Sequence, residues 1–101
     1  MARISWTEQA LDDVEAICEY LHRDAPQYAR VIADDIFQAV ERLTLFPLSG
    51  RIVPEMGRED IREIILAHYR IIYRVVSDEV EVLTVHHSAR LLDPSRWPPS
   101  P

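Results

Sequence analysis

The spacing between apolar residues changes along this chain, from the three- and four-residue steps of a helix in the first half to the alternation of a strand in the second. Between residues 10 and 43 they recur at steps of three and four, which is the spacing of one face of an α-helix. Two stripes result: Ala10, Leu11, Val14, Ile17, Cys18 and Leu21, and then Ala29, Ile32, Ala33, Ile36, Val40 and Leu43. Pro26 separates them and suits the first turn of a second helix, because a missing amide hydrogen costs little there. We therefore expect two amphipathic helices in an antiparallel hairpin.

The ends of the helices carry their own signals. Residues 3–6 are expected to form a short strand, after which Thr7 can cap the first helix and Glu8 lies at its positive end. The pair Phe46-Pro47 marks the stop after the second helix. Both glycines and two prolines gather between residues 47 and 60, which indicates an ordered connecting loop.

Three runs rich in branched and aromatic residues follow, at 61–66, 69–76 and 80–85. The short breaks between them predict tight hairpins and hence an antiparallel meander. In the middle run, alternation places Tyr69, Ile71, Tyr73 and Val75 on one face, which we expect to pack on the helices. The predicted fold is α+β in the order β-α-α-β-β-β, with Ile4 joining at a sheet edge.

Size, charge and cysteine content limit the classes of function. A chain of 101 residues has room for one domain, expected at 1–92, with a Pro-rich tail at 93–101. The net charge is −6, and Met1 to Gly50 holds nine acids against four Arg, so direct binding of nucleic acid is not expected. The single cysteine, the absence of a signal-peptide pattern and the lack of an apolar run of bilayer length favour a cytoplasmic protein without a membrane segment.

Several local strings resemble the ParE/RelE toxin superfamily along almost the whole chain. They are WTEQA at 6–10, FPLSGRIVPE at 46–55, IREI at 61–64, YRIIYRV at 69–75 and VLTVHHSAR at 82–90. The resemblance implies a toxin of a type II toxin-antitoxin pair, neutralised by an antitoxin whose carboxyl-terminal segment wraps it. RelE-like members cut messenger RNA on the ribosome without metal, whereas ParE-like members act against DNA gyrase and lack a recognised nuclease site.

Three residues are candidates for catalysis if the chain is a nuclease. Metal-independent RNA cleavage needs a base, an acid and cations for the phosphorane, all in one place. Arg62 and Arg70 match basic positions of the RelE branch, and His87 falls near the terminal His of some members. However, Ile64 occupies a second lysine position of that site, no Tyr follows His87, and the surrounding charge is not basic.

Structural roles compete with these functional ones. Arg62, Glu63 and Glu81 can form exposed cross-strand ion pairs, and Arg51 with Glu55 can fasten the connecting loop. No metal site is expected, because no further His or Cys lies at ligand spacing, and no cofactor is implied.

The leading hypothesis is a gyrase-binding inhibitor held by a cognate antitoxin. The candidates for contact with the target are Arg51, Arg74, Arg90 and Trp97. The alternatives are a ribosome-dependent endoribonuclease and an interaction module of the same fold that has lost its toxicity.

Overall fold

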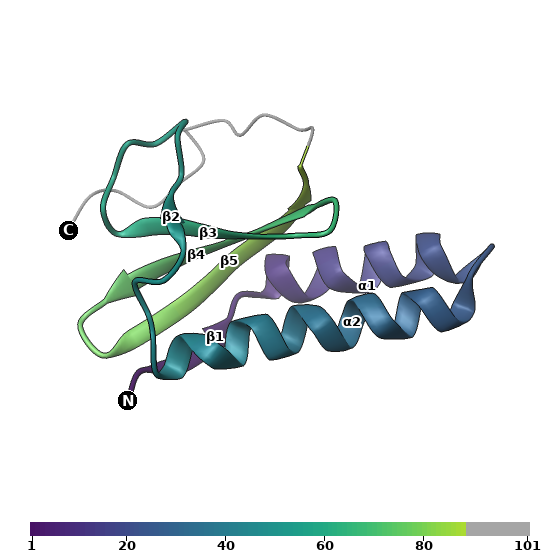
Figure 1. The fold of residues 1–101 in the computed structure, drawn as a ribbon, viewed down its shortest axis with the longest axis horizontal. Coiled ribbons are helices and arrows are strands. Elements are labelled where there is room, and N and C mark those ends of the chain that lie inside the picture. The colour runs from purple at the N-terminus through teal and green to yellow at the C-terminus, as the bar shows by residue number, and fades with distance from the viewer. Residues whose placement is uncertain (89–101) are drawn as a thin grey trace.

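The computed structural model describes residues 1–88, and within them one mixed sheet carries a helical hairpin on one face (Figure 1). In chain order the elements are β1 (Arg3–Trp6), α1 (Glu8–His22), α2 (Pro26–Glu41), a 3₁₀ turn (Arg42–Thr44), β2 (Arg51–Ile52), β3 (Ile61–Leu66), β4 (Tyr69–Val76) and β5 (Glu79–His87). The strand order is β1-β5-β4-β3-β2. The α+β class, the hairpin and the antiparallel meander of β3, β4 and β5 are confirmed; the expected tail at 93–101 lies outside the described residues.

The two outer strands complete the sheet. β1 runs parallel to β5, with Ile4 opposite Val80, which confirms the predicted edge position. β2 was expected to be loop, but Arg51 pairs antiparallel with Glu63. A strand of two residues is too short to show alternation, so only the pairing with β3 reveals it.

The start of α1 follows the sequence prediction and adds a contact with the sheet. The Oγ1 atom of Thr7 accepts a hydrogen bond from the Ala10 amide at 3.0 Å and donates one to the Leu83 carbonyl at 2.9 Å. One turn later, Asp13 accepts from the Thr84 hydroxyl and, at 3.1 Å, from the Val85 amide. Helix α1 therefore satisfies polar groups of β5 beyond the end of β1, where an open edge would otherwise lie.

Apolar packing on the two faces of the sheet differs. On the helical side Tyr69 and Ile71 join a buried cluster with the apolar stripes of both helices, and Tyr73 packs with Leu43 and Val80, as predicted. On the other side Ile61 and Ile72 are buried under Val53. The segment after β2 thus covers part of the face that the helices leave bare.

Tyr73 also holds the connecting loop in place. Its hydroxyl accepts a hydrogen bond from the Gly50 amide and donates one to the Pro47 carbonyl, both at 2.9 Å. A Cβ at position 50 would lie 2.5 Å from that hydroxyl and 2.6 Å from the Glu63 carbonyl oxygen. Only glycine allows this approach of loop to strand.

Candidate functional site

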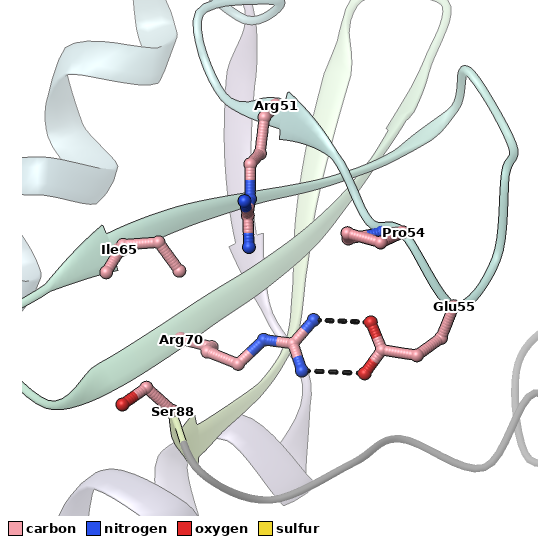
Figure 2. Close-up of a pocket in the computed structure, with 6 residues that line it drawn as sticks. All are labelled: Arg51, Pro54, Glu55, Ile65, Arg70 and Ser88. Carbon is pink, nitrogen blue, oxygen red and sulfur yellow. Dashed lines mark hydrogen bonds and ion pairs between the residues drawn. The ribbon is translucent and has the colours of Figure 1, made fainter.

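Arg70 lies at the centre of a charged cluster on the sheet face away from the helices. Its side chain is 6% exposed. The two η nitrogens donate to the two carboxylate oxygens of Glu55 at 2.7 and 2.8 Å, as Figure 2 shows, and Nε donates to Glu63 at 2.6 Å. The hydrogen bonds that Arg70 donates to Glu55, and then the one that it donates to Glu63, raise the pKa of Arg70 above its usual range although burial opposes this. Arg70 is therefore a permanently charged group with two carboxylate partners.

Glu63 connects Arg70 to Arg51. Its side chain is fully buried, and its second oxygen accepts a hydrogen bond from Arg51 Nε at 2.6 Å. The order of contacts is thus Arg51, Glu63, Arg70, Glu55. The ion pair expected between Arg51 and Glu55 is wrong: each of these side chains pairs with an inner member of the row instead. The loop is still fastened by charge, as predicted, but through β3 and β4.

A cavity of about 510 Å³ opens beside this row (Figure 2). Its described lining residues are Arg51, Pro54, Glu55, Ile65, Arg70 and Ser88. Ile65 is 48% exposed, and the Arg51 side chain is 60% exposed. The cavity therefore combines an accessible cation with an apolar wall.

Arg62 lies on the opposite face of the sheet from Arg70. In the pairing of β3 with β4, Arg62 stands opposite Tyr73 and Arg70 stands opposite Ile65, so strand alternation directs Arg62 and Arg70 to different faces. The guanidinium of Arg62 donates to the carbonyls of Glu59 and Gly50, both at 3.0 Å. The expected cross-strand pair of Arg62 with Glu63 or Glu81 is wrong, because Glu63 is buried on the other face and Arg62 binds backbone carbonyls.

His87 ends β5 opposite Tyr69 and shares the face of that tyrosine. Its ring lies edge-on to Tyr69 with centroids 5.9 Å apart and stacks on His68 at 6.2 Å. Arg70 pairs with His86 instead, on the other face. The structure therefore does not bring Arg62, Arg70 and His87 together around one point.

A second, smaller ion-pair group surrounds Asp60. Arg58 donates to both of its carboxylate oxygens at 3.0 and 2.7 Å, and Arg74 Nε lies 3.5 Å away. The hydrogen bond from Arg58 lowers the pKa of Asp60. Arg74 Nε is buried and has no hydrogen-bond partner among residues 1–88.

Of the other predicted target contacts, Arg51 lines the cavity, whereas Arg90 and Trp97 lie outside the described residues.

Residues 1–88 contain neither a cluster of metal ligands nor a membrane-spanning helix. No group of three or more His, Cys, Asp or Glu side chains there is placed to hold a metal ion. No helix in that part of the chain is long and apolar enough to cross a membrane.

Residues 4–92 match the family described as the ParE toxin of the type II toxin-antitoxin system parDE. The chain belongs to the ParE toxin family. Among relatives, Y4kP, a toxin candidate of Sinorhizobium fredii, is 38% identical over 99 residues, covering 95% of this chain and 93% of the relative. The toxin RelE2 of Caulobacter vibrioides is 32% identical over 91 residues, covering 90% of this chain and 100% of the relative.

Solved structures agree with the fold of this ParE family member. A chain of the chromosomal ParDE system from P. aeruginosa superposes with a TM-score of 0.72 at 23% identity, covering 86% of this chain and 96% of that one. A chain of the RelBE2 toxin-antitoxin complex from Mycobacterium tuberculosis gives 0.53 at 21% identity, covering 85% and 96%. The protein is thus a toxin of a type II toxin-antitoxin system within the ParE/RelE superfamily.

The two acidic members of this row, Glu55 and Glu63, contact Arg70, a partner that the sequence pattern did not predict for either of them. Glu63 follows Ile61 and precedes Ile65 at alternate positions of β3, so period two already places it on an apolar face. A carboxylate at such a position needs a cationic partner from a neighbouring strand. That signal was available in the sequence, although it does not identify Arg70 as the partner.

Proposed function

We propose that this ParE family member inhibits DNA gyrase by binding, acts in the cytoplasm, and is neutralised by a cognate antitoxin. The observation that supports binding over catalysis is that the guanidinium of Arg70 already pairs with carboxylates. A RelE-type nuclease would need this group to bind the scissile phosphate. Here Glu55 and Glu63 occupy its guanidinium. Each such charge-assisted hydrogen bond is worth about 1.5–3 kcal/mol, so a phosphate would have to displace strong, preformed partners.

The positions of Arg62 and His87 also favour binding over catalysis. Arg62 is engaged with backbone carbonyls on the other face, and His87 lies beside Tyr69 rather than Arg70. A general base and a phosphate-binding cation must act on the same nucleotide within hydrogen-bond reach. The arrangement therefore supports inhibition by contact.

The antitoxin is proposed to cover exposed apolar side chains of α2 and of the loop that follows it. Helix α2 carries three apolar side chains that are 44–52% exposed, namely Tyr28, Val31 and Phe37. The following loop carries three more that are 60–63% exposed, namely Leu45, Phe46 and Leu48. Exposed apolar side chains are candidates for contact with a partner, and an antitoxin segment would bury them through apolar anchors.

A gyrase supercoiling assay tests the proposal. The purified full-length chain at micromolar concentration should inhibit supercoiling or trap cleaved DNA, and an equimolar cognate antitoxin should restore activity. Arg74→Gln, at a predicted contact, should weaken inhibition, whereas Arg3→Gln, on an exposed ion pair in the edge strand β1, should leave it unchanged. Unaltered supercoiling at micromolar toxin would refute gyrase as the target.

The ribonuclease alternative draws support from the 32% identity to the toxin RelE2. It predicts transcript cutting in a translating extract, lost in Arg70→Ala and in His87→Ala. Absence of cutting by the wild-type chain would remove it. If cells grow normally when the chain is expressed without an antitoxin, the third hypothesis alone would remain, in which the chain is an interaction module that has lost its toxicity.

A further inference from the structure

We propose that Arg51 and the cavity beside it form a second binding site, which takes an acidic side chain of a partner protein next to an apolar residue. The site lies on the sheet face away from the helices, so it is distinct from the surface proposed for the antitoxin. It goes beyond the proposed function, because it does not depend on which protein is the target.

Spare hydrogen-bond donors on Arg51 are the first observation. Both oxygens of Glu63 and both oxygens of Glu55 already accept from the two arginines. Arg51 uses only its Nε in this row, and within residues 1–88 no group accepts a hydrogen bond from its η nitrogens. Those nitrogens are the fork that binds a carboxylate in bidentate fashion.

Orientation is the second observation. The fully buried carboxylate of Glu63 holds Arg51 Nε at 2.6 Å while the rest of the side chain stays 60% exposed. Figure 2 shows this side chain extending from β2 toward Arg70, with Ile65 on one side and Pro54 on the other. A guanidinium that is fixed before binding loses less side-chain entropy when a ligand arrives.

The third observation is the apolar wall. Ile65 belongs to a strand whose neighbours Ile61 and Glu63 are buried on this face, yet Ile65 is 48% exposed in the cavity. A ligand with an apolar group beside its carboxylate would cover Ile65 while the charge meets Arg51. The Ser88 side chain also lines the cavity and adds a polar group to its wall.

Charge favours a protein carboxylate over a nucleic-acid phosphate. The four groups of the row sum to zero, since two Arg face two Glu, and the whole chain carries −6. One acidic side chain brings a single negative charge to Arg51, whereas a nucleic acid brings a series of charges that a chain of net charge −6 repels.

Nuclear magnetic resonance titration of the full-length chain tests the site with blocked dipeptides. The probes are N-acetyl-Asp-Leu-amide, its neutral isostere N-acetyl-Asn-Leu-amide, and 5′-AMP. The Asp dipeptide should give saturable shifts of the Arg51 Nε–H and Ile65 methyl signals. The Asn dipeptide should bind about tenfold more weakly, because it lacks the charge-assisted contact.

Variants of the chain test whether dipeptide binding depends on this site or only on the overall charge of the protein. Arg51→Gln should abolish the preference for Asp, and Ile65→Ser should weaken both dipeptides while the charge row stays intact. Arg3→Gln removes the same charge from the opposite sheet edge and should bind like the wild type. A preserved amide spectrum in each variant shows that the fold is retained.

Four results would overturn the proposal. They are equal affinity for the two dipeptides, undiminished binding by Arg51→Gln, tighter binding of 5′-AMP at the same signals, and dipeptide binding that emerges only when Asp93, an acidic residue outside the described part of the chain, is changed to Asn. The last would mean that an acidic residue of the chain itself, rather than a partner, is the ligand.

Discussion

Replacing Glu63 by Gln should destabilise the fold more than any other single neutralisation of a carboxylate within residues 1–88. The carboxylate of Glu63 is fully buried and accepts from Nε of both Arg51 and Arg70 at 2.6 Å. Glutamine keeps the volume but replaces one acceptor oxygen with an NH₂ donor. One arginine N–H would then face another donor, and no negative charge would lie between the two cations.

The two contacts of Glu63 contribute unequally. Breaking a buried ion pair by removing one partner costs about 3–5 kcal/mol, which applies to Arg70 because its side chain is 6% exposed. Arg51 is 60% exposed, so solvent screening limits its share to about 1 kcal/mol or less. Since Glu55 still pairs with Arg70, we expect a total loss of about 3–4 kcal/mol. That is a large part of the roughly 5–15 kcal/mol that stabilises a chain of this size.

Urea unfolding followed by circular dichroism measures this loss. Arg51→Gln should cost about 1 kcal/mol or less, and Arg3→Gln, whose pair with Glu79 is exposed, should change stability by under about 0.5 kcal/mol. The double variant Glu63→Gln/Arg70→Gln should cost less than the sum of its single changes by about 1–3 kcal/mol. A loss below about 1 kcal/mol for Glu63→Gln, or additivity of the two changes, would refute the buried-network argument.

Three further predictions concern the loop and the turns. Tyr73→Phe should cost about 1–3 kcal/mol, because the Gly50 amide loses its hydrogen-bond acceptor, and Gly50→Ala should cost a similar amount by steric overlap. Because Arg58 lowers the pKa of Asp60, the stabilisation from this carboxylate is present above its unfolded pKa near 4 and is lost as pH falls through the lower folded pKa. Asp60→Asn should therefore flatten the acid side of a stability-against-pH curve. Ser77→Gly should raise the unfolding midpoint, gaining about 0.5–1 kcal/mol, since Ser77 has a φ of 52°.

Each of these predictions has a matched control. Tyr20→Phe removes a hydroxyl from a tyrosine that is 70% exposed and should be neutral, so an equal loss there would contradict the Tyr73 argument. Asp12→Asn, on the exposed side of α1, should leave the acid slope unchanged. Ser88→Gly should not stabilise, because Ser88 has no positive φ.

Local pattern determined the secondary structure of this protein. Spacing of three and four gave α1 and α2, Thr7 and Pro26 marked their first turns, and runs of branched residues gave β3 to β5. These signals lie within a few residues of one another, so the sequence carries them without reference to the rest of the fold. Strand β2 was missed because two residues cannot display a period.

The expectation that Arg62, Arg70 and His87 converge shows where local pattern stops. The register of β3 against β4 determines whether Arg70 lies on the same sheet face as Arg62. The two-residue turn that pairs Leu66 with Tyr69 sets that register. With one more residue in the turn, Arg70 would stand opposite Leu66 and share the face of Arg62.

The sequence by itself determined that a helical hairpin would lie on an antiparallel meander, and its motifs indicated a ParE/RelE toxin. Only the tertiary structure decided what each arginine does. A charged side chain takes its role from the groups that reach it across strands and loops, and Glu55 and Glu63 reach Arg70 from 15 and 7 residues away. Those contacts bury Arg70 between two carboxylates and leave the side chain of Arg51 60% exposed.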